Sequence, residues 1–444
     1  MIKKAALHTL GCKLNFSETS TIGKQFLSRG FSVVDVNEKA DVYLFNTCTV
    51  TENAERECRQ LVRRALRNNP EAYIIVTGCY AQLRSEEIAA IDGVDAVLGS
   101  NEKFNLFSII KNFEKKGLAC IQVSSTEDSN YFDPASSTEA DSRTRAFLKI
   151  QDGCDYNCSF CTIPLARGKS RSQPAEQLIQ SFTNLVEHGY KEIILTGVNV
   201  GDYGKKENIS LFKLLQKLIK IEGEFRIRIS SIEPNLLTDD LIHLAASTEK
   251  ICNHFHIPLQ SGSLRILKAM QRRYSIRDYE ELIYKLNSRI NDVGIGVDVI
   301  VGFPGESEED FIHTHNFLRD LPISYLHVFT YSERPDTKAI NLPGSVDVVE
   351  RKRRNNILRI LSEKKRSQFY ENMLGKELDV LFESENVKNS MLGFSSNYVR
   401  ICNDYDEEFT NKLTKVEIKG IENGMCYGNI LDIKNSIDLI PAIT

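Results

Sequence analysis

The chain has 444 residues, more than one hydrophobic core usually supports, so two or three domains are expected. Its apolar and charged fractions are those of an ordinary soluble globular protein, and its formal net charge is −4. No apolar run is long enough to span a membrane or to form a signal peptide, so the sequence argues against a membrane protein and predicts a cytoplasmic location.

The cysteine content points to metal chemistry. The sequence contains 11 cysteines, an odd number that a full set of internal disulfide bonds cannot use up. In a reducing compartment, thiols are more often metal ligands than disulfide partners. Several of these cysteines are therefore candidates for a metal site.

The first 120 residues alternate between short apolar runs and helical patterns. Strands are expected at Ala5–Leu10, Phe31–Val36, Val42–Phe45 and Tyr73–Val76, and Ser17 is expected to cap the first helix. Strands and helices that alternate in this way predict a parallel α/β sheet.

Three cysteines follow the ends of these expected strands. Cys12, Cys48 and Cys79 would lie at the carboxyl edge of the sheet, where open α/β sheets bind ligands, and so can meet in space. Their spacing alone fits small buried residues equally well, which is our expectation for Cys58 and Cys120. The shared edge of the sheet favours a metal site.

A polar stretch separates this part from the rest of the chain. Residues 124–142 are rich in Ser, Thr, Asp and Glu and are predicted to be a linker. We therefore expect an N-terminal domain over residues 1–123 and a second domain over residues 143–370.

Three more cysteines lie close together after the linker. The C-x3-C-x2-C run of Cys154, Cys158 and Cys161 can direct three thiolates at one metal centre and leave one coordination position open. Thiolates suit either zinc or an iron–sulfur cluster. The main alternative is a zinc knuckle that takes its fourth ligand from a distant part of the chain.

Six strands, each followed by a polar loop, are expected in the second domain. They are predicted at residues 145–151, 192–195, 225–229, 255–257, 294–301 and 325–330. Most are followed by an amphipathic helix, which predicts an α/β barrel with fewer than eight strands. In such barrels the chemistry lies in the loops after the strands.

The composition of these loops suits an ionic, nucleoside-like cofactor. Glycine allows close backbone approach, amides donate and accept hydrogen bonds, and carboxylates bind ammonium groups or ribose hydroxyls. For a lone Asp or Glu a structural role is the alternative. His254 and His256 match no known metal spacing and are expected to be hydrogen-bonded wall residues. The candidate cofactor-binding residues are Gly197, Asn199, Ser231, Glu233, Gln260 and Asp298.

The C-terminal part has a different pattern. Residues 348–372 predict a long polar helix with a basic run from Arg351 to Arg354, which fits either a solvated face or a contact with a polyanion. Short strand-like segments from residue 377 to 433 predict a small antiparallel β-barrel.

Several segments resemble the methylthiotransferase family of the radical S-adenosylmethionine (SAM) superfamily. The C-x3-C-x2-C run resembles the superfamily signature, and Thr9–Asn15, Asn46–Val50 and Thr77–Cys79 resemble the three cysteine blocks of methylthiotransferases. Gln151–Ser172 resembles their radical SAM block. The likeness covers essentially the whole chain and implies an N-terminal methylthiotransferase domain, a partial (β/α)6 barrel and a TRAM domain over residues 371–444.

The resemblance implies two 4Fe-4S clusters. The C-x3-C-x2-C cysteines would hold the cluster that cleaves SAM, and the three N-terminal cysteines would hold an auxiliary cluster. One SAM would supply a methyl group to a sulfur, and a second would give a 5′-deoxyadenosyl radical that activates a C–H bond for methylthio transfer. An electron donor such as flavodoxin or ferredoxin is also implied.

The family has three kinds of substrate: isopentenyladenosine in tRNA, threonylcarbamoyladenosine in tRNA, and an aspartate of a ribosomal protein. The Thr-Leu-Gly-Cys-Lys and Gln-Asp-Gly-Cys segments look most like the enzymes that act on threonylcarbamoyladenosine in the anticodon loop. Asp336 stands where the family usually has glycine.

Basic and aromatic residues are expected to contact the RNA, since proteins read single-stranded RNA by stacking and by arginine contacts. The candidates are Arg167, Lys169, Arg171 and Arg400, with Phe394 and Tyr398 as a stacking face. Two other classes are considered, an iron–sulfur scaffold or electron carrier without SAM cleavage and a zinc-stabilised RNA-binding protein. A barrel with nucleoside-sized loops disfavours both.

Overall fold

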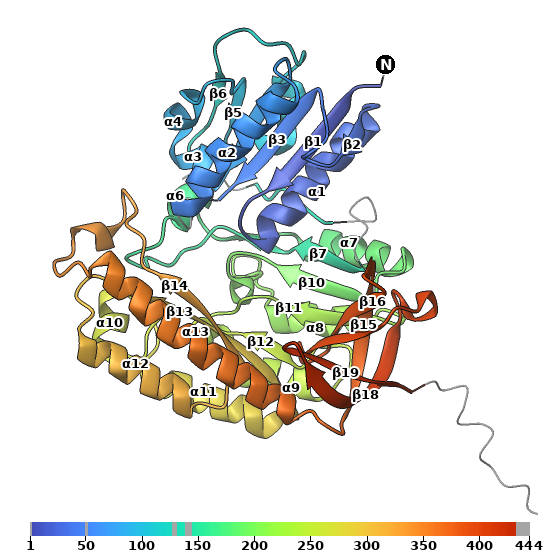
Figure 1. Cartoon of the computed structure of the whole chain (residues 1–444), viewed down its shortest axis with the longest axis vertical. Helices are drawn as coiled ribbons and strands as arrows, with labels where there is room; N and C mark the ends of the chain where they lie inside the picture. Colours follow the sequence, from blue (N-terminus) through green and yellow to red (C-terminus); the bar gives the residue numbers. More distant parts are fainter. Residues whose placement is uncertain (1, 49–51, 127–130, 138–143, 432–444) are drawn as a thin grey trace, which may run out of the picture.

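The computed structural model describes residues 2–48, 52–126, 131–137 and 144–431. The N-terminal α/β unit lies above a partial barrel, and a small β-barrel lies at the lower side of the partial barrel (Figure 1). Within the described ranges, no helix has both the length and the apolar composition that crossing a membrane requires.

A six-stranded parallel sheet forms the N-terminal unit, in the order β2-β1-β3-β4-β5-β6. The central strands β3 and β4 are completely buried. The core lies on both faces of the sheet, with α1 and α5 on one face and α2, α3 and α4 on the other. The strands are β1 (Lys4–Thr9), β2 (Ser32–Val34), β3 (Val42–Thr47), β4 (Tyr73–Gly78), β5 (Ala96–Leu98) and β6 (Cys120–Gln122). The helices are α1 (Lys13–Ser28), α2 (Glu52–Asn68), α3 (Cys79–Leu83), α4 (Ser85–Ala89) and α5 (Leu106–Ile109).

The structure corrects two local expectations in this unit. Helix α1 begins at Lys13, directly after Cys12, so Ser17 lies inside the helix, where its hydroxyl donates to the carbonyl of Leu14. Cys120 is exposed because it lies on β6 at the edge of the sheet. Cys58 is buried, as expected.

Part of the predicted linker packs against the barrel. The amide of Ser137 donates to the carbonyl of Phe147 at 3.0 Å, and Ser136 forms a bridge to Leu148. Phe132 and Ala135 are buried. Residues 131–137 therefore pack along the first barrel strand, whereas residues 127–130 and 138–142 of the predicted linker lie outside the described part of the chain.

Six strands form the expected partial barrel as two parallel three-stranded sheets, β7-β10-β11 and β12-β13-β14. A bridge between Ile227 and Ile251 links the two sheets. The helices cover the outside of the barrel (Figure 1). The strands are β7 (Arg145–Lys149), β10 (Glu192–Thr196), β11 (Arg226–Ile229), β12 (His254–His256), β13 (Gly294–Val301) and β14 (Tyr325–Thr330). The main helices are α7 (Ala175–Glu187), α8 (Leu211–Leu218), α9 (Asp239–Ala246), α10 (Leu264–Ala269), α11 (Ile276–Arg289), α12 (Glu308–Asp320) and α13 (Val348–Glu371).

The barrel strands have an apolar outer face and a polar inner face. Ile193 and Leu195 of β10 belong to the core beneath the helices, as do Ile227 and Ile229 of β11. Because side chains alternate along a strand, the residues between them face the barrel interior. Those residues include Glu192, Arg228, His256 and Asp298. The interior is thus lined by charged and hydrogen-bonding groups.

A closed five-stranded barrel follows α13, in the order β15-β16-β17-β19-β18. Its neighbouring strands are antiparallel as predicted, except that β17 and β19 pair in parallel. Its own core includes Val380, Phe382, Ile401, Val416 and Ile418. This fold is consistent with a TRAM domain, as the sequence predicted, although residues 432–444 lie outside the described part. The strands are β15 (Glu377–Val387), β16 (Ser390–Ser395), β17 (Arg400–Asp404), β18 (Leu413–Glu422) and β19 (Met425–Ile430).

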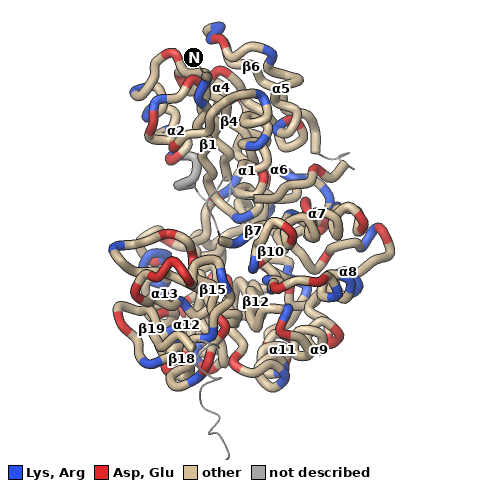
Figure 2. Tube along the Cα trace, turned by 90° about the vertical axis from the view of Figure 1, so that its right-hand side faces the viewer, with Lys and Arg blue, Asp and Glu red and all other residues tan. Residues whose placement is uncertain are grey.

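Two buried arginines of the basic run hold α13 through ion pairs. Arg351 pairs with Glu333, and Arg354 pairs with Glu306 at 2.8 Å. Both arginines are buried, so they form neither a solvated face nor a contact with a polyanion. Lys352 and Arg353 of the same run are exposed, and Arg353 pairs with Glu308 and Glu350. Basic and acidic residues are intermixed along this helix and its neighbours (Figure 2).

The small barrel is attached to the larger one through Glu192. This buried carboxylate pairs with Arg226 at 2.6 Å and with Arg228 at 2.8 Å. The two arginines donate to backbone carbonyls of the small barrel, those of Asp379, Phe394, Ser395 and Ser396. Although burial by itself would raise the pKa of Glu192, the two guanidinium groups hold it well below its usual value.

Replacing Glu192 with glutamine should therefore destabilise the protein strongly. The substitution leaves two buried guanidinium groups without a counter-charge, which typically costs ~3–5 kcal/mol. Urea unfolding followed by circular dichroism measures the loss. The matched control is Glu224→Gln, because Glu224 forms an exposed pair with Lys191 and should change stability by less than ~0.5 kcal/mol. Equal stability of the two variants would contradict the assignment.

Candidate functional site

The structure brings the three N-terminal cysteines together at one edge of the sheet. Cys12 follows β1, Cys48 follows β3, and Cys79 begins α3 directly after β4. These three strands are neighbours, so their carboxyl ends lie side by side. Gly11 packs so closely on this edge that a Cβ there would lie 2.8 Å from the sulfur of Cys48.

A buried arginine lies against this cysteine group. The Nε of Arg167 donates to the sulfur of Cys79 at 3.2 Å, and its Nη2 donates to Asn15 at 2.6 Å. Burial raises the pKa of the Cys79 thiol, and the charge of Arg167 opposes that rise. The site thus supplies a positive charge to a sulfur that must be a thiolate when it binds a metal.

The other three cysteines occupy the loop between β8 (Gln151–Asp152) and α6 (Ile163–Arg167). Burial, with a smaller effect from the charge of Cys158, raises the pKa of Cys154 and that of Cys161 to about 12. Arg272 donates to the sulfur of Cys158 at 3.1 Å. The three thiols therefore act on one another electrostatically, and a bound metal would be needed to ionise them.

The spacing of the sulfurs disfavours zinc at either site. A tetrahedral zinc with ~2.3 Å bonds would place its sulfurs about 3.8 Å apart. Within the described residues, neither set of three cysteines has all its sulfurs within 4.8 Å of one another. A cube of four irons spreads its thiolate ligands more widely than a single ion does. The cysteines present therefore fit iron–sulfur clusters better than zinc.

The polar side chains beside Cys154 fit a polar ligand such as SAM. Asn199 and Asp202 are both buried. Burial raises the pKa of Asp202, and the charge of Lys205, 3.8 Å away, and a side-chain hydrogen bond from Asn199 oppose that rise. The charge of Asp202 acts on Cys154, and the amide of Glu233 donates to Asn199 at 3.4 Å. Glu233 also pairs with Arg272, the residue that contacts Cys158. Carboxylates and amides of this kind suit the ammonium group and the ribose hydroxyls of SAM.

Other predicted cofactor residues have different surroundings. Gln260 and Asp298 line a cavity of about 650 Å³ together with Cys161. Ser231 hydrogen bonds to His256 at 2.6 Å. A Cβ on Gly197 would lie 2.9 Å from the carbonyl oxygen of Gln151, so packing within the protein already requires this glycine.

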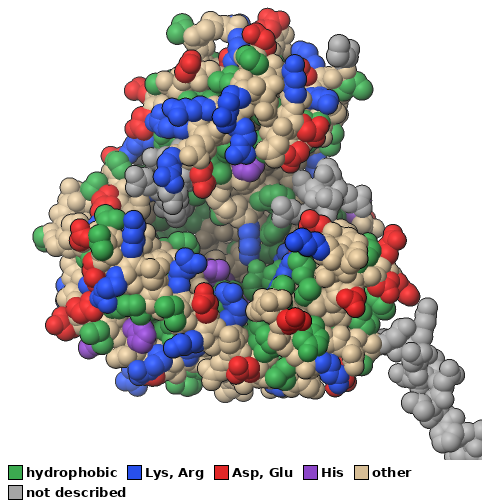
Figure 3. Space-filling model, viewed as in Figure 1, with side chains coloured by type: hydrophobic (Ala, Val, Ile, Leu, Met, Phe, Trp, Pro, Cys, Tyr) green, Lys and Arg blue, Asp and Glu red, His purple; other side chains and the backbone are tan. Residues whose placement is uncertain are grey.

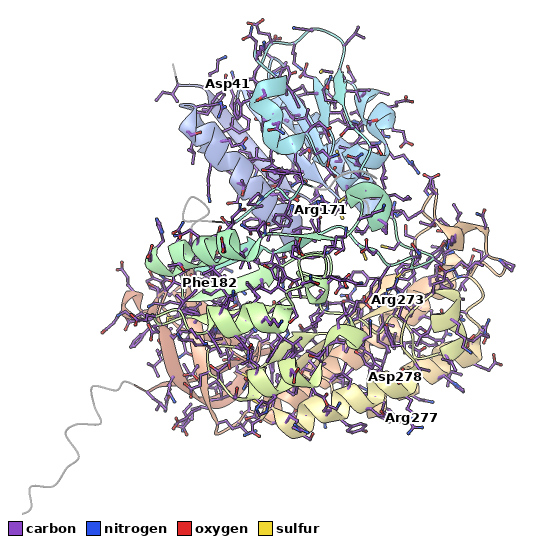
Figure 4. The ribbon with its side chains drawn as sticks, turned by 180° about the vertical axis from the view of Figure 1, so that it is seen from behind. Asp41, Arg171, Phe182, Arg273, Arg277 and Asp278 are labelled. Atoms are coloured by element: carbon purple, nitrogen blue, oxygen red, sulfur yellow. The ribbon has the colours of Figure 1, made fainter. Side chains whose placement is uncertain are left out.

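The structure corrects two of the predicted RNA contacts. Arg167 is only 1% exposed and pairs with Glu18 and Asp152, both at 3.0 Å. Arg171 is also buried and pairs with Asp152 at 3.2 Å. It lies where the N-terminal unit meets the barrel (Figure 4). Lys169, which lies between these two buried arginines in the sequence, is exposed.

The aromatic residues of the predicted stacking face pack against other residues of the protein. The ring of Tyr398 stacks on Phe394 at 4.6 Å and on His254 of the barrel at 4.4 Å. Arg400 lies over Phe394 at 4.3 Å and pairs with Glu383. These aromatic rings attach the small barrel to the larger one, which corrects their assignment as a free RNA-stacking surface.

The molecule is hollowed between the N-terminal unit and the barrel (Figure 3). Basic, histidine and apolar side chains are visible in this hollow. A separate cavity of about 900 Å³ lies between the amino-terminal edge of the barrel and the small barrel, and it contains none of the predicted site residues. Sequence reasoning missed Asp202, Arg272 and His327, because single residues outside a motif give no signal of their partners.

Comparisons with known proteins agree with this arrangement. Residues 4–99 match the model of an uncharacterized protein family, UPF0004, and residues 148–318 match the radical SAM superfamily. The threonylcarbamoyladenosine tRNA methylthiotransferase MtaB of Bacillus subtilis is 39% identical over 419 residues, which is 93% of each chain. The protein of the same name from Aquifex aeolicus is 42% identical over 386 residues, 86% of this chain and 93% of that one.

A relative named for another substrate and a solved structure are more distant. The tRNA-2-methylthio-N(6)-dimethylallyladenosine synthase of Endomicrobium trichonymphae is 33% identical over 430 residues, 96% of this chain and 99% of that one. The radical SAM methyltransferase TsrM from Kitasatospora setae aligns with a TM-score of 0.56 over 77% of each chain. Its identity of 14% indicates a shared fold alone.

The two cysteine groups should be separable by substitution. Replacing Cys154, Cys158 and Cys161 with alanine should abolish reductive cleavage of SAM and leave about four irons in the reconstituted protein, because only the other site remains. Replacing Cys12, Cys48 and Cys79 should also leave about four irons but retain cleavage. Iron analysis and chromatography of 5′-deoxyadenosine measure both effects.

The control for these variants is Cys120→Ala, which removes an exposed cysteine of the same N-terminal unit. It should keep about eight irons and full cleavage of SAM. Stoichiometric zinc, or loss of cleavage in both triple variants, would contradict two separate cluster sites.

Proposed function

The chain belongs to the tRNA methylthiotransferase family, and we propose that it adds a methylthio group to carbon 2 of N6-threonylcarbamoyladenosine next to the anticodon of tRNA. The family uses SAM and 4Fe-4S clusters, which supply the methyl group, the sulfur chemistry and the radical. The chain's own residues bind these groups, orient them and keep water from the radical.

The observation that carries the proposal is the junction between the two cysteine sites. Arg167 follows the cysteine loop of the barrel by six residues, yet it contacts Cys79 and Asn15 of the N-terminal unit. It also binds Asp152, which stands two residues before Cys154. One buried side chain thus connects the two cysteine sites. A reaction in which both sites act on one substrate requires them to be held in a fixed arrangement. A cluster scaffold or electron carrier has no need of this connection to a SAM-sized cavity.

Roles for individual residues follow from this arrangement. We assign Cys154, Cys158 and Cys161 to the cluster that cleaves SAM, and the three N-terminal cysteines to the auxiliary cluster. Asn199, Glu233, Gln260 and Asp298 remain the proposed contacts to SAM, with Asp202 added to them. Lys169 remains a proposed RNA contact.

The substrate assignment rests on likeness to relatives. The two proteins named for threonylcarbamoyladenosine are 39% and 42% identical to this chain, against 33% for the relative named for dimethylallyladenosine. Dimethylallyladenosine in tRNA is the second candidate. A ribosomal-protein aspartate has less support, since these relatives are all named for tRNA.

The proposal includes the domain limits, the electron donor and the cellular location of the protein. We propose domain limits of 1–123, 124–142, 143–370 and 371–444, with residues 131–137 of the linker held against the barrel. A flavodoxin or ferredoxin would supply the electrons, and the protein would act in the cytoplasm.

Deleting the gene should remove 2-methylthio-threonylcarbamoyladenosine from tRNA and leave its unmethylthiolated precursor in its place. Mass spectrometry of nucleosides from digested tRNA measures both species. The wild-type gene should restore the product, and a gene encoding Cys79→Ala should not, because that variant lacks one ligand of the auxiliary site. If the strain instead loses the dimethylallyl product, the second candidate substrate is correct.

A further inference from the structure

The outer face of α2 carries a row of exposed arginines. The inner face packs into the core of the N-terminal unit through buried residues such as Cys58, Val62 and Ala65. The arginines follow one another at intervals of three or four residues, so they lie together on the opposite face of the helix. We call Arg56, Arg59, Arg63 and Arg67 the arginine row, and all four are exposed.

The arginine row is a local positive surface on an acidic protein. The formal net charge of the chain is −4, so its overall charge does not attract a polyanion. From Arg59 to Arg67, however, four of the nine residues are arginine, and the acidic residues of α2 all precede Arg59. Figure 3 shows basic side chains gathered on the face of the N-terminal unit that α2 covers in Figure 1. This face therefore attracts anions although the protein as a whole is acidic.

The surroundings of the arginine row differ from those of the basic run in α13. Arg353 of that run is also exposed, but it pairs with Glu308 and Glu350. No member of the arginine row forms an ion pair with another residue in the described ranges. The neighbouring Arg64 donates a hydrogen bond to the side chain of Asn37 at 3.3 Å. The guanidinium groups of the row thus keep their N–H donors for an anion from outside the protein.

The arginine row leads away from the cysteine site. Helix α2 starts four residues after Cys48, at the edge of the sheet where the three cysteines meet. Because β3 and β4 run in parallel, the helix between them must run back across the sheet. At ~1.5 Å per residue, the row from Arg56 to Arg67 is about 16 Å long. The hollow opens below these basic side chains on the same face of the molecule (Figure 3).

We propose that the arginine row binds backbone phosphates of the anticodon stem while the anticodon loop enters the hollow. The inference rests on the proposed function and deepens it, because it names a surface that positions the RNA. A guanidinium stays charged and donates two parallel hydrogen bonds to one phosphate. Several of them in a row match a strand of regularly spaced phosphates. Such contacts fix the orientation of the RNA and carry no sequence information.

The observations favour RNA over an acidic electron-transfer protein as the partner. An electron donor needs only a short path to a cluster, which the start of α2 would provide. Arg67 lies in the last turn of the helix, toward the edge of the sheet opposite the cysteines. A stem that leads away from a loop in the hollow passes along the full row, whereas an electron donor has no need of its far end.

The test titrates reconstituted protein with an anticodon stem–loop RNA that carries threonylcarbamoyladenosine, and follows binding by fluorescence anisotropy at several salt concentrations. Replacing Arg59, Arg63 and Arg67 with glutamine should weaken binding at least about tenfold at low salt. Each lost phosphate contact lowers the slope of log K against log salt by about 1, so this variant should lower it by about two to three. The unmodified stem–loop should lose the same factor, because its phosphates are the same.

Two control variants separate phosphate binding from general charge. Replacing Lys213, Lys217 and Lys220 with glutamine removes three exposed cations at α8 on the outside of the barrel. Affinity should then change by less than about twofold, because salt screens charges beyond ~10 Å. Replacing the three arginines with lysine should retain most of the salt slope but weaken binding, since lysine does not bind phosphate bidentately. Iron content and SAM cleavage with dithionite should be unchanged in every variant.

Unchanged affinity and salt slope in the triple glutamine variant of α2 would overturn the proposal, as would equal weakening in the variant of α8. A third result would also overturn it: normal RNA binding with loss of the SAM cleavage that reduced flavodoxin drives. The arginine row would then be the docking site of the electron donor. Failure of the wild-type protein to bind either stem–loop would instead contradict the proposed function.

Discussion

A buried charge network at the junction of the two large units is the constraint on which the site depends. Arg167 pairs with Glu18 of α1 and with Asp152 before the cysteine loop, and Lys149 and Lys103 join the same group. Taking such charges out of water is costly unless each finds its partners. Burial alone would raise the pKa of Glu18, yet the surrounding cations hold it well below its usual value. The N-terminal sheet and the barrel must therefore meet in one arrangement, which sets the two cysteine groups on either side of a shared hollow.

The chemistry of the hollow follows from how the barrel strands divide their side chains. Aliphatic residues face the helices and stabilise the barrel, which leaves the inner positions available for polar groups. Glu192 and its two arginines close the lower end and attach the small barrel. The side chains of Asp298, His256 and His327 lie within 4.8 Å of one another, and Asp298 lines the cavity that contains Cys161. The apolar core and the polar lining of the barrel are thus supplied by opposite faces of the same strands.

The sequence predicted the strands and both cysteine groups, because periodic apolar runs and short metal-ligand spacings are local signals. It misplaced features that depend on partners far along the chain. Arg167 and Arg171 were assigned to RNA because a sequence shows their charge but not the buried carboxylates that they meet. The aromatic pair Phe394 and Tyr398 was assigned to RNA for the same reason. His327 gave no signal, since its position beside Asp298 depends on the register between β13 and β14.

The central claim is that this chain carries out radical methylthio transfer at carbon 2 of a threonylcarbamoyladenosine. The most direct measurement supplies the reconstituted protein with stem–loop RNA that carries deuterium at that carbon, and follows the deuterium by mass spectrometry. The account predicts that the methylthio group is added at carbon 2 and that the deuterium is recovered in 5′-deoxyadenosine. Deuterium that remains in the methylthiolated RNA, or a methylthio group at another atom, would contradict it.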